Sequence, residues 1–348
     1  WVLHNQNEAD PNGQDVRTEP KFMLPDGEVF SGAWCRPQND GPGLRATALI
    51  MAANSLIAAG QKDYVTEYMW TGDNSKYNGG AIKYDLDYVV SGYSSNTCDL
   101  WEEIRDPDLF WNRATMKKAM IVGAEFAQAM GDSSSASAYT NAMQQINSTL
   151  YSAHYNGAFV QECASRTRDS AVIVGFNDAY DEADSMFAPT SLEVANTISS
   201  YNSMFCSQYA INTQDSAAGV SGVLYGRYQG DTYAGGNPWV LSTAALASVF
   251  YRAATQILQE GAPSSQALSV WQAAINSPNT LPTSSVALAQ VFAAQGDGVM
   301  LRLRKHVEAD GFHLDEQIDR NTGEQMSAED LTWSYAETLN AMYYRDQY

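Results

Sequence analysis

Residues 109–130, LFWNRATMKKAMIVGAEFAQAM, are the stretch that decides the fold class of this 348-residue chain. Apolar or small residues recur along it at helical spacing, at Met116, Met120, Gly123, Ala127 and Met130. Gly131 follows directly, and glycine commonly ends a helix because it adopts left-handed backbone angles without penalty. The pattern therefore predicts one long helix over residues 109–130.

Helical patterns also dominate the rest of the chain. They predict further helices over residues 43–59, 82–90, 133–150, 238–259, 264–275, 284–295, 298–308 and 327–344. The serines at 133–135 are expected to cap the helix that they begin. The Asn, Asp, Gly and Pro residues that are frequent up to about residue 34 predict a long loop there. For residues 153–236 we predict loops with shorter helices. Because strand alternation is weak throughout, we predict an all-α fold of about ten helices.

Composition narrows the possible partners. Asp and Glu total 40 against 20 Lys and Arg, which gives a net charge of -20. Such a chain repels phosphate, so nucleic acid is not expected as a partner. The sequence contains no run of 18 apolar residues, so no membrane partner is expected either. Low charge density, with 17% charged residues, is typical of many secreted hydrolases, and we expect a secreted, extracellular monomer.

Four cysteines, Cys35, Cys98, Cys163 and Cys206, are spread along the chain. They form no CxxC pair and the four histidines do not cluster with them, so we predict no metal site and no cofactor. In a secreted protein the even count permits disulfides. The tripeptide at residues 147–149, NST, predicts N-glycosylation at Asn147.

The acidic segment at residues 99–103, DLWEE, precedes the helix over residues 109–130. Cleavage of an acetal needs a carboxylic acid that stays protonated, and apolar neighbours favour that form. Leu100 and Trp101 can supply such neighbours for Glu102. The alternative is a helix N-terminus, where acidic residues complement the helix dipole.

A second acidic segment, DEQ at residues 315–317, lies far downstream. Glu316 could activate a water molecule as a general base, although most acidic loops are simply solvated. Arg227, with Asp231 four residues later, could donate to sugar hydroxyls or form only a loop salt bridge. Trp34 could stack on a pyranose ring or belong only to a structured helix entry.

Taken together and in this order, these segments resemble the fungal glucoamylases of glycoside hydrolase family 15. The matching segments are Trp34, RPQ at 36–38, DGP at 40–42, LRAT at 44–47, DLWEE at 99–103, GRY at 226–228, DTY at 231–233, GNPW at 236–239, EQ at 316–317, GEQ at 323–325 and SAEDLTWSYA at 327–336. The resemblance covers nearly the whole chain and is highly specific as a set.

The resemblance implies an (α/α)6 toroid, with residues 1–348 forming a single catalytic domain and no starch-binding domain. It implies the activity of a glucan 1,4-α-glucosidase on starch and maltooligosaccharides. Such an enzyme hydrolyses α-1,4 bonds, and more slowly α-1,6 bonds, from non-reducing ends. The configuration is inverted, β-D-glucose is released, and no metal takes part.

The resemblance also implies roles for individual residues. Glu102 would be the general acid and Glu316 the general base, and the remaining residues would bind or orient the substrate. Those residues are Trp34, Leu100, Trp101, Glu103, Arg227, Asp231, Gln317, Ser327 and Trp333. Among them Asp231 would orient Arg227, while Gln317 and Ser327 would orient the base or its water.

Two departures from the family pattern bear on function. The family carries an N-terminal helical segment with a Trp-Thr-Arg-Asp-Ser motif that grips the terminal glucose, and this motif is absent from the sequence. We therefore expect an N-terminally incomplete toroid, and keep a glycan-binding pseudo-enzyme or inactive fragment as an alternative to the hydrolase, besides a trehalose-type α-glucoside hydrolase. Cys35 and Cys98 stand where known members have other residues, which suggests a disulfide between the Trp34 loop and the acid loop.

Overall fold

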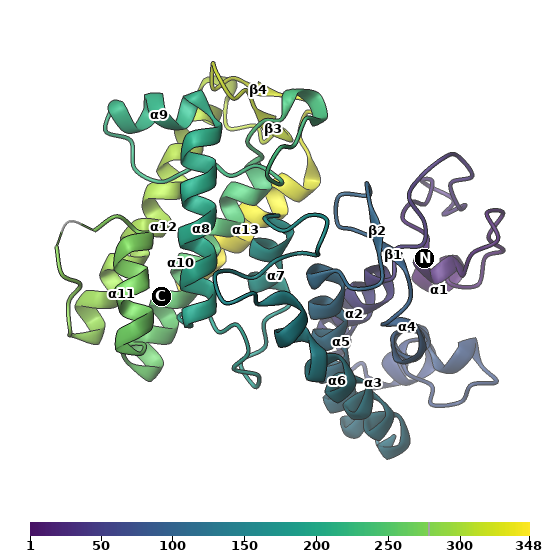
Figure 1. Cartoon of the computed structure of the whole chain (residues 1–348). Coiled ribbons are helices and arrows are strands. Elements are labelled where there is room, and N and C mark those ends of the chain that lie inside the picture. The colour runs from purple at the N-terminus through teal and green to yellow at the C-terminus, as the bar shows by residue number, and fades with distance from the viewer. Residues whose placement is uncertain (278) are drawn as a thin grey trace. The chain divides into compact units, whose positions relative to one another are not determined.

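The computed structural model describes residues 1–277 and 279–348. The chain forms two compact units, Trp1–Ala153 and His154–Tyr348 (Figure 1). Helices carry most of the regular structure in both, and the named strands within the described residues form two short hairpins. The all-α prediction is therefore confirmed, whereas a single catalytic domain stays a prediction.

The first unit contains four long helices and one hairpin. Its elements are α1 (Val2–Asn5), η1 (Val16–Thr18), α2 (Asp40–Ala58), α3 (Lys62–Tyr64), η2 (Val65–Met69), η3 (Tyr77–Gly79), α4 (Ala81–Gly92), β1 (Thr97–Cys98), β2 (Arg105–Asp106), α5 (Phe110–Ala129) and α6 (Ser133–His154), which ends at the unit boundary. Helix α2 packs against both α4 and α5. Gly123 in α5 has Leu86 of α4 against it, where a Cβ atom would lie 2.7 Å from a Leu86 methyl group. The small residue thus allows the two helices to approach closely.

The helix predicted over residues 109–130 is α5, and Gly131 follows it with a φ of 83°. The cap predicted for the next helix is different. Asp132, rather than a serine, takes this position: its carboxylate accepts the Ser135 backbone N–H at 2.9 Å and the Ser135 hydroxyl at 2.7 Å. Aspartate is as good an N-cap as serine, and here it precedes the three serines.

The second unit is built around one buried helix. Its elements are α7 (Ala171–Asp178), α8 (Leu192–Gln208), α9 (Ala210–Ala217), η4 (Tyr233–Gly235), α10 (Val240–Glu260), α11 (Ser265–Ala274), α12 (Ser285–Val307), η5 (Glu308–Asp310), β3 (Gln317–Ile318), β4 (Gln325–Met326) and α13 (Thr332–Gln347). Helix α10 is buried along most of its length and packs against α7, α12 and α13, while α8 packs against α11. A helix that is apolar on nearly all sides belongs in a core, as α10 does.

The prediction of two helices over residues 284–295 and 298–308 is wrong, because α12 runs through both without a break. The intervening glycines serve packing instead. A Cβ atom at Gly296 would lie 2.6 Å from the ring of Tyr251 in α10, and one at Gly298 would lie 2.9 Å from Ser221. A glycine inside a helix costs about 1 kcal/mol relative to alanine, which close packing of the neighbouring elements offsets.

The last helix begins later than predicted, at Thr332 instead of Ser327. Ser327 and Asp330 have φ angles of 77° and 51°, in the left-handed region, and a right-handed helix cannot pass through them. Residues 327–331 therefore form a loop beside the β3–β4 hairpin, where Glu316 donates its backbone N–H to the Ala328 carbonyl at 2.9 Å.

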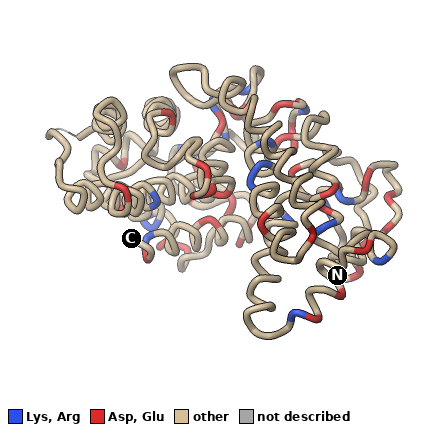
Figure 2. The backbone as a smooth tube through the Cα atoms, turned by 90° about the horizontal axis from the view of Figure 1, so that it is seen from below, with Lys and Arg blue, Asp and Glu red and all other residues tan. Residues whose placement is uncertain are grey.

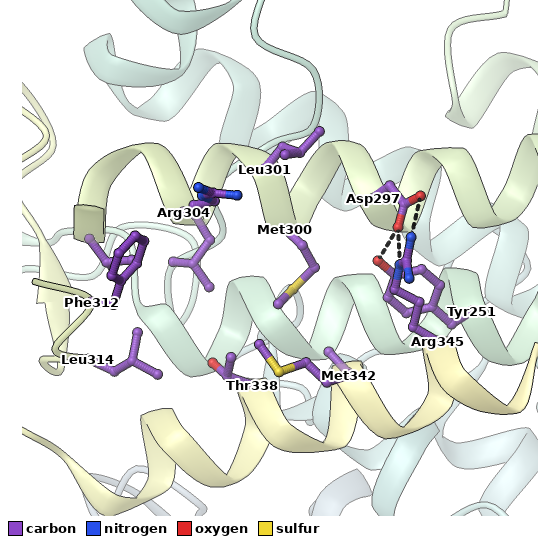
Figure 3. Close-up of a pocket in the computed structure, with 13 residues that line it drawn as sticks. Tyr251, Asp297, Met300, Leu301, Arg304, Phe312, Leu314, Thr338, Met342 and Arg345 are labelled. Atoms are coloured by element: carbon purple, nitrogen blue, oxygen red, sulfur yellow. Dashed lines mark hydrogen bonds and ion pairs between the residues drawn. The ribbon is translucent and has the colours of Figure 1, made fainter.

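An apolar groove of about 550 Å³ lies along α10, α12 and α13 in the second unit (Figure 3). Met300, Leu301 and Met342 are among the residues that line it. At one end Asp297 accepts hydrogen bonds from the Tyr251 hydroxyl at 2.9 Å and from the Arg345 Nε at 2.6 Å. None of the site residues predicted from the sequence is among the described residues that line this groove.

Acidic residues occur on many segments of both units (Figure 2). They are not gathered into one stretch of the chain, which fits the twofold excess of 40 acidic over 20 basic residues. Within the described residues, every helix is too short or too polar to cross a lipid bilayer.

Candidate active site

The predicted site residues fall into two groups. Trp34 and residues 100–103 belong to the first unit, and the others, from Arg227 to Trp333, belong to the second. We call the residues 99–103 the acid segment and the residues 315–317, with the loop 327–331, the base segment.

The acid segment forms the turn between β1 and β2, ahead of α5, and is not the N-terminus of that helix. Its conformation is set by Asp99, whose side-chain Oδ1 accepts the backbone N–H groups of Glu103 at 2.7 Å and of Ile104 at 2.9 Å. The Asp99 carbonyl accepts the Glu102 N–H at 3.0 Å. A buried aspartate that folds the chain around itself in this way makes a defined turn.

Glu102 occupies a special backbone position in this turn, with a φ of 64°. Its side chain is half-buried, and Oε1 accepts a hydrogen bond from Gln38 Nε2 at 2.6 Å. Burial raises the pKa of the neighbouring Asp40, and the charge of Glu102 adds to that rise. A non-glycine residue in left-handed conformation is strained by about 1–3 kcal/mol, and such residues cluster at functional sites.

The hypothesis of a Cys35–Cys98 disulfide is confirmed. The bond joins the loop that holds Trp34 to β1, directly before Asp99. The Cys98 N–H also donates to the Pro37 carbonyl at 2.9 Å. Two independent links thus place Gln38 beside the acid segment.

The aromatic residues of the first unit differ in exposure. Trp34 is 41% exposed, with the Phe30 ring edge-on at 5.8 Å and the Lys21 ammonium 4.6 Å from its ring centre. Trp101 is buried and Leu100 is half-buried, while Glu103 is exposed. Trp34 therefore offers a ring face that can take part in stacking, and Trp101 contributes chiefly to the packing behind the turn.

The base segment holds Glu316 half-buried beside two donors. Glu316 Oε2 accepts from Gln317 Nε2 at 2.9 Å and from the Ser327 hydroxyl at 2.5 Å. The two residues that the resemblance assigned to orient the base thus do contact it. These two donors hold the Glu316 carboxylate in one orientation.

Arg227 and Asp231 form a buried bidentate ion pair. Arg227 Nε donates to one carboxylate oxygen at 2.9 Å and Nη2 to the other at 2.7 Å. The rings of Tyr233 and Trp239 lie 4.7 and 5.1 Å from the guanidinium carbon. This planar geometry fixes the guanidinium, and sugar binding by Arg227 stays a prediction.

Residues 226–239, which include Arg227 and Asp231, meet the base segment within the second unit. The backbone of Trp239 forms a bridge with Gln317, and the Ile318 N–H donates to the Pro238 carbonyl at 2.9 Å. The loop that carries Arg227 and Asp231 and the segment that carries Glu316 are therefore positioned by the same short hairpin.

Trp333 sits near the start of α13 and donates its indole N–H to Glu337 Oε1 at 3.2 Å. Glu337 in turn interacts with Asp178 of α7, and burial followed by the mutual repulsion of the charges raises the pKa of Glu337. Burial likewise raises the pKa of Asp178. The sequence did not reveal this pair of carboxyl groups. Through its hydrogen bond, Glu337 fixes the position of the Trp333 indole.

Asn147 lies inside α6, half-buried, and its Oδ1 accepts a hydrogen bond from the Lys117 ammonium at 3.3 Å. Glycosylation at this residue stays a prediction.

Two further contacts escaped sequence reasoning. Gln38 donates to Glu102, and Asn237 donates to Gln317 at 2.9 Å. The disulfide suggested by the resemblance held a signal for the first, because a Cys35–Cys98 bond brings residue 38 close to residue 102. No sequence signal marks the second contact, which joins positions far apart in the chain.

Comparison with known proteins decides the family. The model of glycosyl hydrolases family 15 matches residues 2–343. The chain belongs to glycosyl hydrolase family 15. Among curated family members, a glucoamylase of Blastobotrys adeninivorans is 33% identical over 98% of this chain, and glucoamylase-1 of Schizophyllum commune is 35% identical over 93% of it.

Solved structures of the family agree with this assignment. The family 15 glucoamylase from Hypocrea jecorina matches 99% of this chain with a TM-score of 0.87 at 29% sequence identity. A Saccharomycopsis fibuligera glucoamylase matches 99% with a TM-score of 0.84 at 25% identity. The helical fold predicted from the resemblance is thereby confirmed.

The chain spans only part of these relatives. It covers 58% of the Blastobotrys protein, 56% of the Schizophyllum protein and 58% of the Hypocrea jecorina chain. The family shows that the chain is a glucoamylase-like glycoside hydrolase by descent.

Proposed function

We propose that the protein is a secreted, monomeric glucan 1,4-α-glucosidase that removes β-D-glucose from the non-reducing ends of starch and maltooligosaccharides. The observation that carries the proposal is the pair of donors on Glu316, from Gln317 and Ser327. A glutamate in such a setting, and a second glutamate on a defined turn, support the proposal, since inverting hydrolysis uses two carboxyl groups.

In the proposed reaction Glu102 is the general acid. It gives its proton to the glycosidic oxygen as the bond from that oxygen to the anomeric carbon breaks. Glu316 takes a proton from a water molecule, whose oxygen attacks the anomeric carbon from the opposite face. The product sugar therefore has inverted configuration, and α-linked glucan gives β-glucose. This geometry requires about 6.5–9.5 Å between the two carboxyl groups to admit the water.

The other residues would bind and orient the substrate. Arg227, held by Asp231, would donate to hydroxyls of the non-reducing-end sugar, and Glu103 would accept from hydroxyls on the leaving-group side. Trp34 and Trp333 would supply apolar walls. Fixed contacts of this kind contribute to rate by positioning the substrate before the chemical step.

The test measures glucose release from maltose, soluble starch and trehalose by the purified protein, with the anomer followed by proton NMR. We expect release from maltose and starch, β-glucose as the first product, and a bell-shaped acidic pH profile. Glu102→Gln and Glu316→Gln should each abolish nearly all turnover. Glu125→Gln and Glu260→Gln change exposed glutamates outside the predicted site and serve as matched controls, one in each unit.

Other outcomes separate the alternatives. Trehalose cleavage without maltose cleavage would replace the proposed substrate. Binding of maltooligosaccharides without turnover, and with Glu102→Gln without effect, would indicate a glycan-binding protein instead of an enzyme. An α-glucose product would contradict the inverting mechanism.

A further inference from the structure

A chain of hydrogen bonds runs from the backbone of the β3–β4 hairpin to Glu316. It begins at the Arg320 backbone N–H, which donates to Asn237 Oδ1 at 3.2 Å. On the other side of the same amide, Asn237 Nδ2 donates to the Ala234 carbonyl oxygen at 2.8 Å. A backbone N–H can only donate and a carbonyl can only accept, so these two partners fix which end of the Asn237 amide is which.

The fixed orientation of the Asn237 amide in turn fixes the orientation of the Gln317 amide. Asn237 Nδ2 also donates to Gln317 Oε1 at 2.9 Å, and Met326 Sδ lies 3.3 Å from the same nitrogen. With its oxygen occupied in this way, Gln317 points Nε2 at Glu316 Oε2, at 2.9 Å. Asn237 is 2% exposed and Gln317 is fully buried, so bulk water does not compete for these positions.

The reverse orientation of Gln317 would be unfavourable twice. Its oxygen would face the Glu316 carboxylate, which is an acceptor against an acceptor, and its nitrogen would face Asn237 Nδ2, a donor against a donor. A buried polar group without a partner is unfavourable, because it has given up its hydrogen bonds to water without replacing them. Asn237 therefore leaves Gln317 with one acceptable orientation, in which it donates to Glu316.

We propose that Asn237 is a positioning residue that acts through Gln317 to keep a hydrogen-bond donor directed at Glu316. The inference rests on the proposed role of Glu316 as general base, and it adds Asn237, from the loop before α10, to the residues that orient this carboxylate. The backbone contacts of Trp239 with Gln317 and of Pro238 with Ile318 keep Asn237 in register with the hairpin.

The test is a double-mutant cycle read by the titration midpoint of Glu316 itself. The glutamate side-chain carboxyl groups are labelled with 13C, the Glu316 resonance is assigned with Glu316→Gln, and its shift is followed against pH without substrate. Asn237→Ala and Gln317→Met are compared singly and together. Both changes are neutral, so Asp315, Arg320, Glu329 and Asp330 around the base segment keep their charges in every variant.

We expect Gln317→Met to raise the midpoint by about one pH unit, since the carboxylate loses one charge-assisted hydrogen bond. Asn237→Ala should raise it by a similar or smaller amount, and the double variant by no more than Gln317→Met alone. Two shifts that add, or an unchanged midpoint in Asn237→Ala, would overturn the proposal. Asn202→Ala, which removes an amide that donates to the Ala274 carbonyl in the same unit, should leave the midpoint unchanged.

A second variant guards against misfolding of Asn237→Ala. Asn237→Asp keeps the oxygen that accepts from Arg320, replaces the donor by an acceptor, and adds a negative charge. The added charge raises the Glu316 midpoint whether residue 317 is Gln or Met. If Asn237 acts through Gln317 (the relay), the rise is larger with Gln317 present than with Gln317→Met. An equal rise in both refutes the relay. Because the titration needs no turnover, an inactive protein with an intact cycle refutes only the proposed function, and an active enzyme with an additive cycle refutes only the relay.

Discussion

Removal of the Cys35–Cys98 disulfide should destabilise the first unit and loosen the acid segment. The two cysteines are separated by 63 positions, and closure of a loop of this length in the unfolded chain is worth about 4 kcal/mol on the chain-entropy model. We therefore expect Cys35→Ala/Cys98→Ala to lower the free energy of unfolding by up to about 4 kcal/mol. With a urea m-value of about 2 kcal/mol/M, the midpoint of unfolding falls by roughly 2 M.

The measurement is urea unfolding followed by tryptophan fluorescence, together with amide hydrogen exchange of Glu103 and Ile104. The Asp99 carboxylate protects both amides, so loss of the tether should speed their exchange. Cys206→Ala, which changes an exposed free thiol, is the control. An unchanged urea midpoint with unchanged exchange at both amides would refute the reasoning, as would alkylation of Cys35 and Cys98 in unfolded protein without reductant.

The remaining predictions concern buried charges of the second unit. Burial raises the pKa values of Glu337 and Asp178 in the folded protein, so as the pH rises these groups ionise in the unfolded chain first. Their contribution to stability is therefore present below about pH 4 and is lost as the pH rises through the raised pKa values of the folded state. Glu337→Gln should therefore flatten the fall in melting temperature between pH 5 and pH 8, and an unchanged slope would contradict this. Arg227→Met should lower the free energy of unfolding by about 3–5 kcal/mol, because Asp231 is left buried and unpaired. Arg227→Met/Asp231→Leu should recover most of that loss in thermal unfolding, and a double variant no more stable than the single one would argue against the buried-charge explanation.

Local sequence predicted the elements whose causes are local. Helix α5 follows from apolar spacing that ends at Gly131, and both lie within one continuous stretch. The break predicted within α12 is wrong because Gly296 packs against the ring of Tyr251 instead of ending a helix. Tyr251 is distant in sequence, so a helical pattern does not reveal this contact. The late start of α13 has the same kind of cause, since the left-handed angles of Ser327 belong to a loop beside Glu316.

The site residues show the same difference between what local sequence predicts and what depends on residues distant in sequence. Family resemblance pointed to Glu316, Gln317 and Ser327, and the structure brings these three into hydrogen-bond contact. The resemblance included Gln38 and Asn237 in its matching segments but gave them no role, because their contacts with Glu102 and Gln317 join residues that are distant in sequence. Residue types in a pattern indicate the chemistry, whereas the orientation of an amide depends on neighbours supplied by the fold.

The left-handed backbone at Glu102 has a consequence for how this residue is retained over generations. Glycine or asparagine fits that conformation better than glutamate, so a mutation of Glu102 to either residue removes the carboxylate and also relieves strain of about 1 kcal/mol or more. Cellular quality control, which removes chains that misfold, would not purge such a variant. Glutamate at this position can be maintained only by selection on what its side chain does, and natural variants at residue 102 would therefore report directly on whether the chemistry is still in use.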